Sequence, residues 1–144
     1  MVQSSDIAGA ARGWIGTPYR HQASLKGVGT DCLGLVRGVW REINGAEPES
    51  VPAYSQGWAE DSGAEMLAAA AARNMSKTPC TEISAGALLL FRWRPHLPAK
   101  HAGIATSASH MVHAQDNACV TEIFLSSWWR RHLAFTYRFP GVDA

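Results

Sequence analysis

The feature that most constrains the fold of this chain is a change in hydrophobic periodicity near Cys80. Before Cys80, apolar residues recur at helical spacing in residues 6–14 and 32–43, and the alanine-rich segment 59–73 has a high helix propensity. Beyond it, the chain has short β-like runs at residues 87–93, 101–106, 111–114, 118–123 and 134–139, with a helical turn expected at 126–132. Helices followed by strands predict an α+β domain, in which N-terminal helices pack on a C-terminal antiparallel β-sheet.

The segment from Cys32 to Ile43 has the clearest helical pattern. Its apolar residues fall at positions i, i+3, i+4, i+7, i+8 and i+11, namely Cys32, Leu35, Val36, Val39, Trp40 and Ile43. The pattern ends at Asn44-Gly45, a typical helix stop. Gly34 and Gly38 lie four residues apart on this helix, a spacing that permits close backbone packing.

The first predicted helix follows three good N-cap residues, Ser4, Ser5 and Asp6. It stops at Gly16-Thr17-Pro18, and the Gly-rich, polar segment that follows predicts a loop up to the second helix. Trp14 and Trp40 lie on apolar helical faces, so we expect both in the core.

Composition excludes several classes of function. The 144 residues suit a single domain, taken as residues 1–144, and 47% hydrophobic with 17% charged residues is too apolar for disorder. A net charge of +1 predicts no nucleic-acid or membrane partner. The N-terminus lacks the pattern of a secretory signal, and no segment is apolar enough for a membrane span, so we expect cytoplasmic synthesis and export by a carrier.

The 3 cysteines are an odd number without CxxC spacing, so neither a disulfide framework nor a metal site is expected, and no cofactor is implied. Cys80 and Cys119 are most simply small core residues. Cys32 differs, because it follows Thr30-Asp31 at a helix start. Backbone N–H groups and the helix dipole there favour the thiolate over the thiol, although an inert core cysteine is the alternative.

His101 and His113 lie in consecutive predicted strands around the turn Ser107-Ala108-Ser109. If residues 106 and 110 pair, paired residue numbers sum to 216, so His113 opposes Gly103 and the two rings share one face of the sheet within hydrogen-bond range. A base that is held by a third polar group is what a nucleophilic thiol requires. An odd sum would place the rings on opposite faces.

Four separated motifs are Trp14-Ile15-Gly16-Thr17-Pro18-Tyr19, G-V-G-T-D-C-L-G over residues 27–34, His101-Ala102-Gly103-Ile104 and Met111-Val112-His113-Ala114. Together they resemble the pattern of the NlpC/P60 family of cell-wall peptidases. Within the family, Pro-Tyr-Arg-His-Gln-Ala-Ser and the C-terminal Trp-Trp-Arg-Arg and Phe-Pro elements are similar to phage-type peptidases encoded among tail genes, including those of gene transfer agents.

The resemblance implies a papain-like fold and the role of each matching residue. Cys32 is the implied nucleophile, His101 the general base and His113 the third member. Tyr19 and Asp31 are the implied oxyanion and substrate-binding residues, the Tyr19 hydroxyl acting with the Cys32 backbone N–H. Leu33 stands where many members have Ser, which places in doubt any substrate preference taken from the wider family.

The implied function is a cysteine endopeptidase that hydrolyses peptidoglycan stem peptides, at the D-γ-glutamyl to diaminopimelate bond. As a component of a phage or gene transfer agent tail or baseplate, it would act at the wall of a recipient cell. Two alternatives stay open: a structural tail component that keeps the fold without cutting, and an acyltransferase or amidotransferase that uses the same Cys-His site.

Several other residues are weaker candidates. Arg92, Arg94 and Lys100 precede the His101 strand and could meet stem-peptide carboxylates, and His21 is expected to border the cleft. Trp128 and Trp129, flanked by Arg130 and Arg131, are candidates for a docking surface or for the core.

Overall fold

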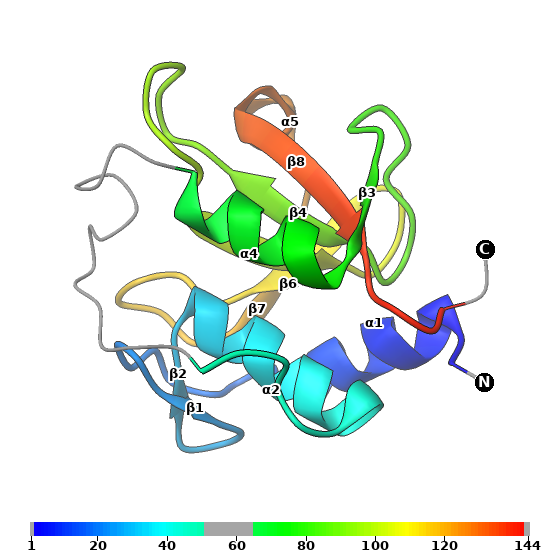
Figure 1. Ribbon diagram of the computed structural model, residues 1–144. Coiled ribbons are helices and arrows are strands. Elements are labelled where there is room, and N and C mark those ends of the chain that lie inside the picture. The colour runs from blue at the N-terminus through cyan, green and yellow to red at the C-terminus, as the bar shows by residue number, and fades with distance from the viewer. Residues whose placement is uncertain (1, 51–64, 143–144) are drawn as a thin grey trace.

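The computed structural model describes residues 2–50 and 65–142. They form helices packed on a six-stranded antiparallel sheet, with a two-stranded hairpin at one side (Figure 1). The helices are α1 (Ser4–Arg12), α2 (Cys32–Asn44), α4 (Met66–Asn74) and α5 (Ser127–His132). The strands are β1 (Ser24–Leu25), β2 (Gly29–Thr30), β3 (Ser76–Thr78), β4 (Leu88–Phe91), β5 (His101–Ala105), β6 (His110–His113), β7 (Thr121–Phe124) and β8 (Leu133–Arg138).

The order of the large sheet is β3-β8-β4-β5-β6-β7, and all its pairings are antiparallel. In the β5–β6 hairpin, Gly103 pairs with His113, Ile104 with Val112 and Ala105 with Met111. The two residue numbers of each pair sum to 216, so the predicted register is confirmed. The α+β class with an antiparallel C-terminal sheet is confirmed as well, together with the helical turn before the last strand.

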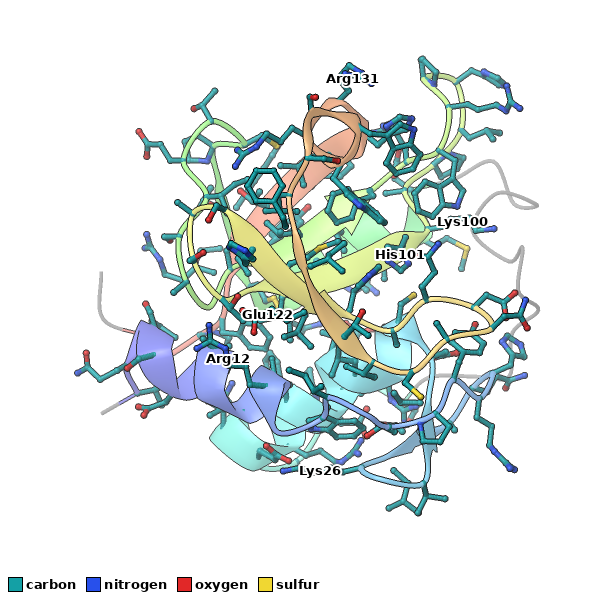
Figure 2. All side chains as sticks on the ribbon, turned by 180° about the vertical axis from the view of Figure 1, so that it is seen from behind. Arg12, Lys26, Lys100, His101, Glu122 and Arg131 are labelled. Carbon is teal, nitrogen blue, oxygen red and sulfur yellow. The ribbon has the colours of Figure 1, made fainter. Side chains whose placement is uncertain are left out.

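The two faces of the sheet bury different clusters, because side chains alternate along each strand. One face packs against α1, α2 and α4 through Leu88, Leu90, Ala102, Ile104 and Val112. The other face packs against the segment around α5 through Leu89, Phe91, Ala105 and Met111. Strand β4 is therefore buried on both sides, and Figure 2 shows this second face with α5 in front of the sheet.

Helix α2 begins and ends where the sequence predicts. Asp31 is its N-cap, with a carboxylate oxygen that accepts the Gly34 N–H at 2.7 Å, and Gly45 ends it at φ 86°. The close packing expected of Gly34 and Gly38 is confirmed, since a Cβ at Gly34 would overlap the Ala23 carbonyl oxygen and one at Gly38 would overlap the Trp14 ring.

The start of α1 differs from prediction. Gln3 is the N-cap, and the Asp6 carboxylate accepts the Gln3 backbone N–H at 2.9 Å. The reason is that a carboxylate three residues into a helix can satisfy the capping N–H group, as in a capping box. Three short strands, β1, β2 and β3, were not predicted, and the part of the predicted 59–73 helix before residue 65 lies outside the described residues.

Two cysteines contradict the core prediction. Cys80 and Cys119 are both exposed, because Cys80 lies in the turn after β3 and Cys119 precedes β7, which begins only at Thr121. Trp14 is buried as predicted, whereas Trp40 is only partly buried at the edge of the core. In the described ranges, no helix combines the length and apolarity needed to cross a bilayer.

Gly38→Ala should destabilise the protein, because the added methyl group would overlap the buried Trp14 ring. We expect the free energy of unfolding, measured by urea denaturation, to fall by about 1–3 kcal/mol. Gly9→Ala in α1 is the matched control, since a Cβ there meets nothing within 4 Å and should leave stability unchanged or slightly higher. Equal stabilities for the two variants would show that the contact between Gly38 and the Trp14 ring is not tight.

Candidate active site

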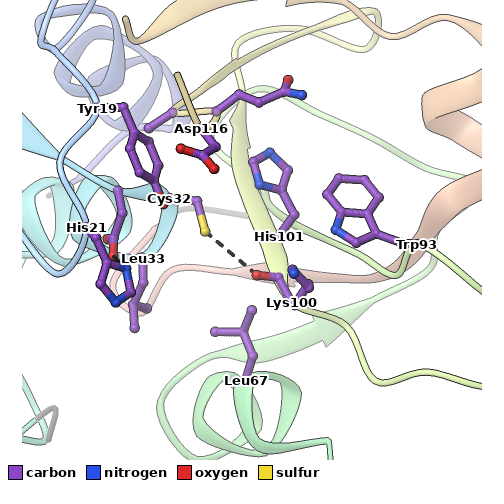
Figure 3. Close-up of a pocket in the computed structure, with 12 residues that line it drawn as sticks. Tyr19, His21, Cys32, Leu33, Leu67, Trp93, Lys100, His101 and Asp116 are labelled. Carbon is purple, nitrogen blue, oxygen red and sulfur yellow. Dashed lines mark hydrogen bonds and ion pairs between the residues drawn. The ribbon is translucent and has the colours of Figure 1, made fainter. Parts of the chain in front are cut away.

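Cys32 is the first residue of α2, and its sulfur lies against the start of β5. The thiol donates to the Lys100 carbonyl oxygen at 3.7 Å, and the backbone N–H groups of Leu33 and Ala102 interact with the sulfur. In Figure 3 the sulfur lies beside the His101 ring. The N-terminal end of the helix and the first residues of the strand thus bring the thiol and the imidazole to one place.

Burial, followed by the charge of the Asp31 carboxylate, raises the pKa of Cys32 to about 12. The two N–H groups and the Lys100 ammonium oppose this effect but do not overcome it. The sequence prediction that this position favours the thiolate is therefore wrong for the ligand-free protein, because burial outweighs the helix terminus. The raised pKa favours the protonated thiol before substrate binds.

His101 and His113 form the hydrogen-bonded pair that the register predicts. His101 Nε2 and His113 Nδ1 are 2.9 Å apart, and the two residues are 6% and 3% exposed. Burial lowers the pKa of His101 to about 3, with the charges of His113 and Lys100 acting in the same direction. Burial also lowers the pKa of His113 to about 4. Both rings are therefore neutral near pH ~7, and His101 can accept a proton.

Cys32 and His101 line the same pocket, with a volume of about 370 Å³ (Figure 3). Such a volume lies within the ~300–1,000 Å³ range of ligand pockets. The remaining lining residues are Tyr19, His21, Asp31, Leu33, Leu67, Trp93, Lys100, Ala114, Gln115 and Asp116. His21 and Lys100 therefore border the cleft as expected, while His113 lies behind His101, away from the pocket lining.

Tyr19 is fixed at the pocket wall by its backbone, which bridges to Thr30 and donates to the Ala118 carbonyl oxygen. Its hydroxyl points toward Cys32 in Figure 3. This placement suits an oxyanion donor, whose assigned role stays a prediction.

Asp31 lies at the pocket wall but uses both carboxylate oxygens on the protein itself. One accepts the Gly34 N–H and the other accepts the Gln22 N–H, each at 2.7 Å. The second oxygen also lies 3.8 Å from His21 Nδ1. The geometry indicates that Asp31 fixes the loop and the helix start around Cys32.

Other sequence candidates lie apart from the pocket. Arg92 donates to Glu65 at 2.7 Å and to the Leu97 carbonyl oxygen, and Arg94 is exposed and outside the pocket lining. Trp128 is 45% exposed, but Trp129 is partly buried against His101 and His113. Among the residues placed by the structure, no group of three or more His, Cys, Asp and Glu side chains is arranged to hold a metal ion.

The sequence reasoning did not find Trp93, Leu67 or Asp116 at this site. Trp93 stacks on His101 with ring centroids 5.3 Å apart, and Leu67 reaches the pocket from α4. No motif marks them, because the strand order and the packing of α4 bring them to the pocket from distant parts of the sequence. The polar turn after His113 was the one available signal for Asp116.

The buried neutral histidines should make stability depend on pH. Their pKa values lie below the ordinary value of 6.5, so their stabilising effect is fully present above pH ~6.5 and is lost as the pH falls toward their folded values. We expect the free energy of unfolding to fall by about 1–2 kcal/mol per histidine between pH ~7 and pH ~5. Urea denaturation at each pH measures this change.

The loss between the two pH values should be smaller for His113→Gln, which removes one of the two groups. His96→Gln, at an exposed loop position, should follow the wild type. A wild-type free energy of unfolding that is equal at both pH values would contradict the neutral, buried state of the pair.

Comparison with solved structures identifies the fold. A Staphylococcus aureus protein described as similar to lipoprotein, of the NLP/P60 family, has a TM-score of 0.63 and 20% identity over 98% of this chain and 42% of its own. The NlpC/P60 domain of the peptidoglycan hydrolase SagA has a TM-score of 0.65 and 22% identity, with 96% and 100% coverage. A Bacillus cereus NlpC/P60 family protein has a TM-score of 0.69 and 17% identity, with 96% and 40% coverage.

This chain therefore spans less than half of the S. aureus and B. cereus chains and matches the whole SagA domain. No curated protein sequence matches it. The profile of the NlpC/P60 family matches residues 16–138, which include Tyr19, Cys32, His101 and His113. The protein has the papain-like NlpC/P60 fold and belongs to the NlpC/P60 family.

Proposed function

We propose that this protein is a cysteine peptidase that hydrolyses peptidoglycan stem peptides. The observation that carries the proposal is the placement of Cys32 and His101 in one pocket, with His113 hydrogen-bonded behind His101 at 2.9 Å. A nucleophile, a base and a group that orients the base are the requirements of acyl transfer through a thiol.

The tautomer of the pair follows from this role. When His101 Nε2–H donates to His113 Nδ1, His101 Nδ1 keeps its lone pair and can take the Cys32 proton. The sulfur then attacks the amide carbon, and the negative charge develops on the carbonyl oxygen near the Tyr19 hydroxyl and the Cys32 N–H. The leaving amine takes the proton from His101, and water, activated by the same ring, hydrolyses the thioester.

The neutral resting states of Cys32 and His101 are compatible with proton transfer from the thiol to the imidazole. Transfer of the proton from Cys32 to His101 creates a thiolate and an imidazolium together, and their attraction in a buried site offsets part of the cost of charging either one. The N–H groups of Leu33 and Ala102 stabilise the thiolate as it forms.

The proposed substrate rests on family membership and on the polar residues of the pocket. The SagA domain, which shares the fold, is described as part of a peptidoglycan hydrolase. Lys100, His21 and Asp116 surround the pocket with groups of both signs, which suits a peptide that carries free carboxylates and amines. Within this class, we assign the D-γ-glutamyl to diaminopimelate bond.

The proposal includes delivery by a phage-like tail or baseplate to the wall of a recipient cell. It is supported by the resemblance of two sequence elements, Pro-Tyr-Arg-His-Gln-Ala-Ser and Trp-Trp-Arg-Arg, to phage-type peptidases. Purified particles should contain this chain by immunoblotting, and particles that lack it should cross the recipient wall poorly. If particles that lack the chain cross the recipient wall as efficiently as complete ones, this part of the proposal is wrong.

Wild-type protein should release new termini from purified diaminopimelate-containing sacculi, and Cys32→Ala should release none. Mass spectrometry should identify a free diaminopimelate amine and a glutamate carboxyl at the cut. Cys80→Ala is the matched control, because this thiol is exposed and lies outside the pocket lining, and it should retain wild-type activity.

The same digest separates the alternatives. Stem peptides joined to an added amine, without free glutamate carboxyls, would indicate acyl transfer rather than hydrolysis. Equal release by wild type and Cys32→Ala would remove Cys32 as the nucleophile, and no release by either would favour a structural component that keeps the fold.

His101→Ala should lower kcat by about 10²–10⁴-fold, because it removes the base. His113→Ala should leave a higher residual rate, since the base remains and only its orientation is lost. Single-turnover assays on a soluble stem peptide measure both variants. His110→Gln serves as the control, because His110 is on β6 with His113 but lies outside the pocket lining. A residual rate lower in His113→Ala than in His101→Ala would reverse the assigned roles.

A further inference from the structure

The histidine pair is covered on the sheet face opposite α2 by an aromatic cluster, made of Phe91, Trp93, Trp128 and Trp129. Trp129 contacts both histidines, with ring centroids 5.7 Å from His101 and 5.2 Å from His113, the latter edge-on at 85°. Phe91 packs edge-on against Trp129, with ring centroids 5.0 Å apart, and also contacts His101. Of the four aromatic residues, Trp129 alone has a ring contact with both members of the pair within the part of the chain that the structure describes.

The backbone fixes Trp129 at both ends of α5. Before the helix, the Leu125 N–H donates to the Ser109 carbonyl oxygen at 2.7 Å, which ties the segment to the β5–β6 turn. After it, the Arg92 N–H donates to the His132 carbonyl oxygen at 2.9 Å, which ties the helix to the end of β4. Trp129 therefore has a set position relative to the strands that carry the two histidines.

Arg130 adds a third anchor. Its guanidinium donates to the carbonyl oxygens of Leu125 and Ala108, each at 3.1 Å, and so links α5 directly to the hairpin that carries His101 and His113. Figure 2 shows His101 below α5, with Arg131 at the outer end of that helix.

We infer that Trp129 is a positioning residue, which holds His101 and His113 in their hydrogen-bonded geometry and keeps water from that bond. The expected effect of Trp129 on catalysis rests on the proposed function. Its expected effect on the two histidines does not. The indole plane lies at 34° to the His101 ring and at 85° to the His113 ring, and contact with both limits the rotation of the two imidazoles. Exclusion of water disfavours the protonated state of both rings.

Trp128 offers a matched comparison on the same helix turn. It is 45% exposed, contacts Trp93, Trp129 and His132, and has no ring contact with either histidine of the pair. Its replacement removes a neighbouring indole of the same size that does not itself touch the pair.

Other charged or titratable groups near the pair do not come from α5. His113 on β6 is bonded to His101, and the groups that share the pocket with His101 are Lys100 beside it, Cys32 and Asp31 at the start of α2, His21 and Asp116. On α5 itself, Arg130 is bonded to backbone carbonyls and His132 stacks on Trp128. Replacement of Trp129 by an apolar residue therefore changes water access and packing around the pair without changing its charged neighbours.

The test compares Trp129→Leu, Trp129→Phe and Trp128→Leu by imidazole nitrogen NMR titration and by the pH profile of kcat/KM on a soluble stem peptide. We expect Trp129→Leu to raise the pKa of both histidines toward 6.5 and to move the acid limb of the profile to higher pH. It should lower kcat/KM by about 10–100-fold, mainly through kcat. Trp129→Phe should restore most of both properties, and Trp128→Leu should match the wild type.

The inference is overturned if folded Trp129→Leu keeps the wild-type histidine titration, or if Trp128→Leu shifts it equally. If no variant and no wild-type protein cuts peptide, the proposed function fails, and the NMR titration still decides the role of Trp129. Thermal melting identifies an unfolded variant. If Trp129→Leu does not fold, Trp129→Met, which also lacks a ring, takes its place with the same expected and contrary results.

Discussion

The contact between the first turn of α2 and the first residues of β5 is the constraint on which the site depends. The Cys32 sulfur reaches the Lys100 carbonyl at 3.7 Å only because α2 packs close to the sheet and to α1. Gly38 admits the Trp14 ring, and Gly34 admits the Ala23 carbonyl. Side chains at either position would push the helix away from its neighbours and separate the thiol from His101.

Burial at this contact sets the electrostatics of the site in an unexpected direction. The N-terminus of a helix favours a thiolate, yet the pKa of Cys32 rises to about 12, because water is excluded and Asp31 lies beside it. Asp31 has a structural role there, because its carboxylate accepts hydrogen bonds from the backbone N–H groups of Gln22 and Gly34. The same residue thus fixes the geometry of the nucleophile and disfavours its ionisation before substrate binds.

The sequence predicted the parts of the site that depend on local periodicity. Helical spacing identified Cys32 as the start of α2, and the turn around Ala108 fixed the register that pairs Gly103 with His113. The state of the thiol was not predictable, since burial depends on loops and strands far away in sequence. Trp129 was ambiguous between a docking surface and the core, because its neighbour His101 is separated from it by 28 positions and is reached only through the fold.

Gly103 lies beside the diagonal pair of histidines whose ring nitrogens come within 2.9 Å. His113 pairs directly with Gly103, and diagonal neighbours in a hairpin are ordinarily ~7–8 Å apart at their Cα atoms. A Cβ at Gly103 would lie 2.6 Å from the Met111 sulfur and 3.4 Å from the His113 Cβ, so a side chain there would occupy the space beside the His113 side chain. The Met111 sulfur lies in that space, so a side chain at position 103 would displace Met111 from the packing beside the His101–His113 pair. The glycine two residues after the base therefore permits the packing that surrounds the pair.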